Sequence, residues 1–151
     1  MTIDEALTKQ AFIVKLKFKD GDDELSKPLM VKIMKARIKL NKIRAEFDKD
    51  LQTAVEGFQT DEFKKLQEKG DKRTKKDNDK FKELVDKINS EVQDYINSRV
   101  KDEAKDVDDI TFTEDEYDEL IPINADVDTE INGVKLSGPD FLETIHSIFV
   151  K

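Results

Sequence analysis

The only histidine in the sequence, His146, stands three residues after Glu143 in a segment with helical periodicity. Glu-x-x-His on one helix face is the spacing found in di-iron carboxylate proteins, but such a site needs a second pair and two further carboxylates. One chain with one histidine cannot supply that second pair. Ser147 does not form a nucleophilic pair with His146, because adjacent residues on a helix do not face each other. The pattern favours a partly exposed histidine beside an apolar helix face.

A second candidate begins at Asp128, where acidic and amide side chains occupy every other position up to Asn132-Gly133. Oxygen ligands at positions 1, 3 and 5 and a glycine at position 6 are typical of a calcium-binding EF-hand loop. The match fails at position 8, which is Lys135, and at position 12, where Pro139 replaces the bidentate glutamate. Asn-Gly between apolar residues is also a strong signal for a two-residue hairpin turn, and we interpret the segment in that way.

The chain contains no cysteine, which excludes disulfides, thiolate nucleophiles and cysteine-ligated metal sites. Its five glycines lack the spacing of a phosphate-binding loop. We therefore expect a protein that is not an enzyme and that binds neither a metal nor a cofactor.

The best candidate for a functional surface is a basic stretch that contains no acid. Its cations are Lys27, Lys32, Lys35, Arg37, Lys39, Lys42 and Arg44. A basic amphipathic helix binds phosphate backbones, anionic membrane surfaces or acidic protein grooves. The first aromatic residue is Phe47, so the stretch offers no base stacking. Three interpretations remain open: a solvated helix face, pairing with the acidic segment 102–119 of the same or another subunit, and binding of an external polyanion such as nucleic acid.

Charge is distributed unevenly along the 151 residues, whose formal net charge is −8. Residues 1–100 contain 23 Lys and Arg against 20 Asp and Glu, whereas residues 101–151 contain 4 against 15. With 41% charged and only 36% hydrophobic residues, the chain has little material for a thick core. This length and composition favour one domain of ordinary size with an elongated or partner-dependent shape.

The elements that must position these residues are mainly helices. An apolar seam with alternating spacings of four and three predicts a long helix over residues 28–56: Leu29, Ile33, Ala36, Leu40, Ile43 and Phe47. Residues 67–80 contain no apolar side chain and predict a hairpin tip or a mobile connection, after a short helix over 61–69. A second long helix is expected over 81–104. The segment 28–106 therefore predicts a long antiparallel helical hairpin.

Met30, Met34 and Ile38 lie beside or off the main seam of the first long helix. Its apolar surface is therefore wider than one partner helix would cover, and we expect these residues to serve self-association or docking. Together with Lys32, Lys35, Arg37, Lys39 and Lys42 they form the candidate partner-binding set.

The flanking segments are shorter elements. In segment 1–27, Thr2 and Glu5 form a capping box that predicts a helix from Ile3, and the alternation over residues 12–18 predicts a strand, with a continued helix as the alternative. Segment 107–151 predicts an acidic α+β subdomain. Its expected elements are a strand over 110–112, a helix over 114–120 closed by Pro122, a hairpin over 130–136 and a closing helix from about residue 138.

The N-terminal residues are acidic, and the longest apolar run covers only residues 11–14. This pattern predicts neither a secretion signal nor a membrane span, and we expect a cytoplasmic or virion location.

Three segments, residues 30–51, 113–124 and 131–150, carry a resemblance to known proteins: MVKIMKARIKLNKIRAEFDKDL, TEDEYDELIPIN and INGVKLSGPDFLETIHSIFV. They resemble small proteins encoded by tailed phages of gut bacteria. The resemblance implies a virion or assembly component and carries over no catalytic residues. We expect a non-enzymatic structural or adaptor subunit of a larger protein assembly. The alternative is a polyanion-binding accessory protein that uses the basic helix 27–44.

Overall fold

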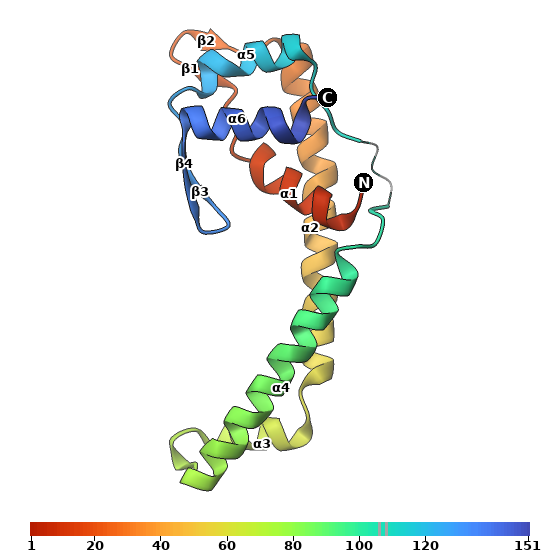
Figure 1. The fold of residues 1–151 in the computed structure, drawn as a ribbon, viewed down its shortest axis with the longest axis vertical. Helices are drawn as coiled ribbons and strands as arrows, with labels where there is room; N and C mark the ends of the chain where they lie inside the picture. Colours follow the sequence, from red (N-terminus) through yellow and green to blue (C-terminus); the bar gives the residue numbers. More distant parts are fainter. Residues whose placement is uncertain (106, 108) are drawn as a thin grey trace. The chain divides into compact units, whose positions relative to one another are not determined.

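The structure, a computed structural model, describes residues 1–105, 107 and 109–151, most of them in helices. In chain order the elements are α1 (Ile3–Ile13), β1 (Lys19–Asp20), β2 (Asp23–Glu24), α2 (Lys27–Phe58), α3 (Asp61–Lys69), a 3₁₀ turn (Gly70–Lys72), α4 (Lys75–Arg99), α5 (Glu114–Asn124), β3 (Asp128–Ile131), β4 (Val134–Ser137) and α6 (Gly138–Phe149) (Figure 1). The expected mostly α fold, with long helices and a small C-terminal region of helices and strands, is confirmed.

The chain divides into two compact units. Unit 1 contains residues 1–44 and 103–151, and unit 2 contains residues 45–102. This grouping differs from the three consecutive regions predicted from the sequence, 1–27, 28–106 and 107–151. The predicted N-terminal and C-terminal regions share one core with the first half of α2, because the seam of α2 from Leu29 to Ile43 belongs to the same buried cluster as Phe12 and Phe141.

Helix α1 begins at the predicted capping box, in which the Thr2 hydroxyl accepts from the Glu5 amide and the Glu5 carboxylate accepts from the Thr2 amide. The strand predicted over residues 12–18 is wrong, and the helical alternative holds up to Ile13. A strand would put Phe12 and Val14 on one face and Ile13 on the other. In the structure Phe12 and Ile13 are both buried and Val14 is exposed, which is the pattern of a helix ending on the core.

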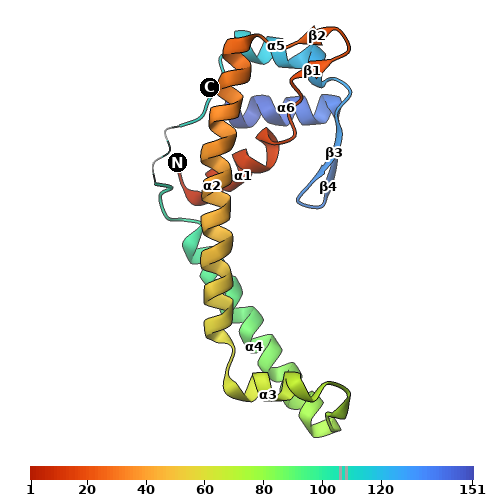
Figure 2. The same cartoon turned by 180° about the vertical axis from the view of Figure 1, so that it is seen from behind.

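The core of unit 1 is formed by α1, the first half of α2, α5 and α6. Helices α1 and α6 lie on the same side of α2 (Figure 2). The ring of Phe12 on α1 lies 6.1 Å from that of Phe141 on α6, and Phe112 lies 5.1 Å from Phe149. The contact between Phe12 and Phe141 joins segments 129 residues apart in the sequence, and that between Phe112 and Phe149 joins the segment before α5 to α6.

Helix α5 is capped by Thr113, whose hydroxyl and the Glu116 carboxylate form the predicted capping box. Its predicted end at residue 120 is wrong, since the helix continues through Pro122 to Asn124. Pro122 lies in the last turn and has no N–H to donate to the carbonyl four residues earlier, so the helix continues past it with one backbone hydrogen bond fewer. The strand predicted over 110–112 is also wrong. Phe112 instead makes one isolated parallel bridge with Val150.

Strands β3 and β4 form the predicted antiparallel hairpin, in which Ile131 pairs with Val134. Asn132 and Gly133 have positive φ angles of 51° and 82°, as a type I′ turn requires. Helix α6 follows directly. At Gly138, its first residue, the backbone lies so close to the Ala125 carbonyl group that a Cβ atom would overlap it.

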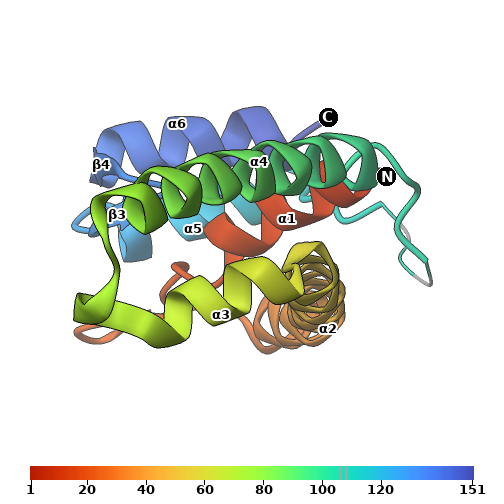
Figure 3. The same ribbon diagram turned by 90° about the horizontal axis from the view of Figure 1, so that it is seen from below.

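Unit 2 consists of the second half of α2, α3 and α4. Asp50 of α2 pairs with Arg99 at the end of α4, whereas Phe58 at the end of α2 lines the same hollow as Leu84 near the start of α4. The two helices are therefore antiparallel, as predicted. Helix α3 lies beside the first part of α4 (Figure 3). The rings of Phe63 on α3 and Phe81 on α4 are stacked, with their centres 5.3 Å apart.

Two boundaries in unit 2 differ from the prediction. Helix α4 begins at Lys75 and ends at Arg99, instead of covering residues 81–104. A capping box of Thr74 and Asp77 starts the helix before its first apolar residue, so most of the polar segment 67–80 is helical. Gly70 ends α3 with a φ angle of 51° and a ψ angle of −124°, a positive-φ conformation outside the left-handed helical region.

Candidate functional site

Within unit 1, helix α2 is apolar on two opposite faces. The inner face is formed by Leu29, Ile33, Ala36 and Leu40, which are buried in the core. The outer apolar stripe consists of Val31, Met34 and Ile38, whose exposed fractions are 47%, 51% and 69%. At about 100° of rotation per residue, positions 31, 34 and 38 project on the side opposite the inner face. The stripe is exposed in this single chain.

The outer apolar stripe contains two of the three apolar residues predicted for docking. Met34 and Ile38 are exposed as expected, whereas Met30 is partly buried and packs against the core. Val31 was missed, although its spacing of three and seven residues from the other two was visible in the sequence. An i, i+3, i+7 pattern marks one face of a helix.

Lys32, a member of the predicted basic set, is paired inside unit 1. Its Nζ donates to Glu116 Oε1 of α5 at 2.6 Å and lies 5.5 Å from the centre of the Phe112 ring. Burial alone raises the pKa of Glu116, but hydrogen bonds from Lys32 and from the Thr113 amide outweigh it, and the net pKa is lowered. This contact joins α2 to α5 through the intramolecular pairing that the sequence left open.

Arg37 is also used inside unit 1. Its Nε donates to the Ile13 carbonyl oxygen at 3.1 Å and its Nη2 to the Leu16 carbonyl oxygen at 2.5 Å. The guanidinium group lies 4.6 Å from the centre of the Phe18 ring. Ile13 is the last residue of α1 and Leu16 follows it by three residues, so Arg37 holds the C-terminal end of α1 and the turn after it against α2.

Three residues of the predicted basic set, Lys35, Lys39 and Lys42, are exposed on α2. Lys35 and Lys39 line an open hollow of about 380 Å³ together with Asp109 and Ile110. Lys42 projects close to the line of the outer apolar stripe, as does the exposed Lys27 one turn before Val31. The stripe therefore has cationic neighbours, and the segment 27–44 contributes no acid.

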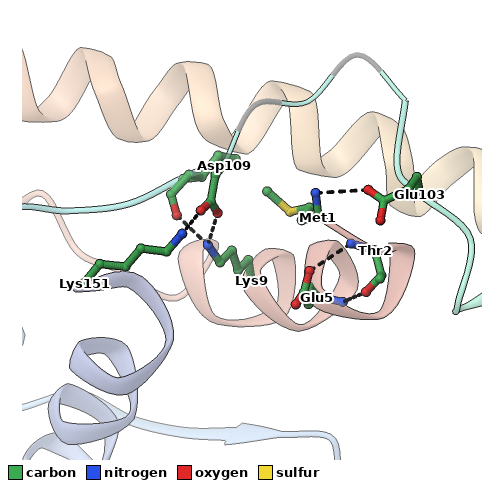
Figure 4. Close-up of polar contacts among 8 residues, drawn as sticks. Met1, Thr2, Glu5, Lys9, Glu103, Asp109 and Lys151 are labelled. Carbon is green, nitrogen blue, oxygen red and sulfur yellow. Dashed lines mark hydrogen bonds and ion pairs between the residues drawn. The ribbon is translucent and has the colours of Figure 1, made fainter.

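A second polar cluster surrounds Lys9 of α1, which is only 6% exposed (Figure 4). Its Nζ donates to Asp109 Oδ1 at 3.1 Å and to the Ile110 carbonyl oxygen at 2.6 Å. Lys151 also pairs with Asp109, and hydrogen bonds from Lys151 and Lys9 lower the pKa of Asp109 to about 2. These charges satisfy one another, so the cluster fastens the segment around Asp109 to α1. An adjoining hollow of about 420 Å³ is lined in part by Met1, Glu5 and Thr8.

The acidic side chains and the histidine with possible chemistry do not gather into a metal site in the part of the chain that the structure describes. His146 is partly exposed, contacts the Tyr117 ring edge-on at 4.8 Å and has its Nε2 3.0 Å from Glu114 Oε1. The Tyr117 hydroxyl donates to the Leu142 carbonyl oxygen at 2.9 Å. Among residues 1–105, 107 and 109–151, no group of three or more His, Asp or Glu side chains is arranged to hold a metal ion.

Comparison with protein-family models, with curated proteins and with solved structures finds no match to this chain. No helix within the described residues is both long enough and apolar enough to cross a membrane.

Proposed function

We propose that this protein is a non-enzymatic structural or adaptor subunit that docks into a larger protein assembly through the outer apolar stripe of α2. One observation carries the proposal: Val31, Met34 and Ile38 are exposed directly opposite the inner face with which α2 packs on the core. Folding of unit 1 needs only the inner face. A second apolar face on the same helix is therefore explained by contact with another molecule.

The restricted extent of the stripe supports this interpretation. The same side of α2 is polar further along, where Lys49, Gln52 and Glu56 are exposed. Apolar side chains are thus confined to about two turns within unit 1. A surface of this size suits one helix or one edge of a partner. On the resemblance to phage proteins alone, we place the assembly in a virion or its assembly machinery.

The experiment compares the substitution Ile38→Asp with Gln52→Asp as a matched control. Both place a carboxylate at an exposed position on the same side of α2, so circular dichroism should show full helix content for both. We expect affinity capture from the native source, quantified by mass spectrometry, to lose its specific protein partners at least tenfold for Ile38→Asp and to retain them for Gln52→Asp. Equal capture by the two variants would refute docking through the stripe.

A second candidate function is the binding of a polyanion, favoured by the exposed Lys35, Lys39 and Lys42 on a segment without acids. Such binding depends on counterion release and weakens steeply with salt. Filter binding with single-stranded and double-stranded DNA and RNA at about 50 mM salt tests it, with a variant carrying Gln at the three lysines. Salt-sensitive binding that this variant loses would favour the second candidate, and absence of binding would reject it.

A further inference from the structure

The outer apolar stripe sets two requirements for the molecule that covers it. The partner must offer apolar side chains to Val31, Met34 and Ile38, and acidic groups to the lysines around them. The segment 27–44 carries seven cations and no acid. Complementary charges steer association and select the partner, whereas like charges side by side are costly. A suitable partner surface is therefore both acidic and partly apolar.

One surface of this chain meets both requirements. Besides the stripe itself, the large apolar side chains that the described residues expose are Val14, Ile121 and Val134. Val14 precedes Lys15 and Val134 precedes Lys135, so both have cationic neighbours. Ile121, 39% exposed, is different because it belongs to α5, which contains five acids and no base.

The acids and Ile121 share one face of α5. Glu114, Asp118 and Ile121 are spaced by four and three residues, which places them on the same side of a helix, and all three are exposed. We name them the acidic face of α5. Leu120 and Ile123 on the opposite side are buried in the core of unit 1, so the acidic face has a fixed support.

We propose that the occupant of the outer apolar stripe is the acidic face of α5 of a second copy of this chain. The inference rests on the docking function proposed above and names the partner. Each surface extends over seven residue steps, from Val31 to Ile38 and from Glu114 to Ile121, or about 10 Å along its helix axis. Within one chain both surfaces are exposed, so a copy does not cover its own stripe.

The contact joins two different surfaces, the stripe of one copy and the acidic face of another, and is therefore heterologous. It closes into a dimer if two copies exchange both contacts about a two-fold axis, and it otherwise propagates as a ring or a chain of subunits. The apolar residues supply the burial. The charges supply the register and make the association sensitive to salt.

Because the chain contains no cysteine, single cysteines report the contact directly. Ile38→Cys is mixed under mild oxidation with Ile121→Cys, one of the two variants carrying a mass tag, and disulfide products are separated on a non-reducing gel. Random pairing would give the mixed disulfide and the two self-paired disulfides in the ratio 2:1:1. We expect the proportion of mixed to self-paired product to exceed this ratio at least fivefold. We also expect the rate at which the mixed disulfide forms to fall severalfold in 1 M NaCl. The control pairs Ile38→Cys with Lys135→Cys, which is exposed on β4.

Three results would overturn the proposal. They are a mixed disulfide that forms no faster than in the control, a preference of Ile38→Cys for pairing with itself, and light scattering of the unsubstituted protein that shows only monomer at low salt and high concentration. None of them removes the docking function, which fails separately if Ile38→Asp keeps all the captured partners. An excess of the mixed disulfide that salt suppresses supports the proposal.

Discussion

The substitution Gly138→Ala tests how closely α6 approaches the end of α5. Gly138 is buried at the first position of α6, and an added Cβ would overlap the carbonyl oxygen and carbon of Ala125. The obstacle is backbone, which cannot rotate away as a long side chain can. The added Cβ would lie 1.7 Å from the Ala125 carbonyl oxygen, so one of the two segments must move by nearly 2 Å to restore an ordinary contact of about 3.5 Å.

Overpacking of this kind usually costs about 1–3 kcal/mol, and a backbone obstacle places Gly138→Ala at the upper end. We expect a loss of about 3 kcal/mol in the free energy of unfolding, or roughly 6–12 °C in Tm for a chain of this size. Guanidinium unfolding followed by circular dichroism at 222 nm measures the loss.

Gly57→Ala is the matched control for this substitution. Gly57 lies in α2, and nothing stands within 4 Å of the position that its Cβ would take. Alanine is the better helix former, so the control should gain up to about 1 kcal/mol. If Gly138→Ala unfolds within about 0.5 kcal/mol of the unsubstituted protein, the close approach of α6 to Ala125 is refuted.

Three further predictions concern polar contacts of unit 1. Lys9→Met removes a buried cation and should lower the free energy of unfolding by about 2 kcal/mol in urea titrations, and an unchanged midpoint would contradict its fastening role. The pKa of Asp109, lowered by Lys151 and Lys9 from 3.8 to about 2, means that its pairing stabilises the fold above pH 4 and that this stability is lost as the pH falls towards 2. Asp109→Asn should therefore flatten the stability curve over that range, and an equally steep curve would refute this assignment. Arg37→Lys keeps the charge but loses the planar two-carbonyl contact, so we expect a cost of about 1 kcal/mol by thermal unfolding, while a Tm equal to that of the unsubstituted protein would count against it.

Local signals predicted those parts of the fold in which neighbouring residues decide the structure. The capping boxes at Thr2 and Thr113 placed the starts of α1 and α5, and Asn132-Gly133 placed the turn between β3 and β4. The start of α4 was missed because its capping box uses Asp77, and because no apolar residue accompanies it. The strand predicted over 12–18 failed because the burial of Ile13 is decided by a core that also includes residues of α2, α5 and α6, and not by local alternation.

The candidate site could be predicted only in part for a similar reason. Exposure of Met34 and Ile38 follows from the helical period of α2 itself. Which cations are paired does not follow from this period. The partner of Lys32 lies 84 residues away in the sequence, and the two carbonyl groups bound by Arg37 lie 24 and 21 residues away. Composition shows that a basic surface exists, whereas tertiary contacts decide which of its charges stay exposed.

The division of the chain into a continuous and a discontinuous unit also bears on the order in which it folds. The contact between Lys9 and Asp109 closes a loop of 100 residues, and the entropy cost of closure grows with loop length. Unit 2 is formed by the contiguous residues 45–102, which lie inside this loop. Its contact between Asp50 and Arg99 brings the beginning and the end of the unit together. We expect the hairpin to form first and to shorten the effective loop that unit 1 must close. During synthesis the inner face of α2 therefore stays exposed until residues 103–151 have emerged.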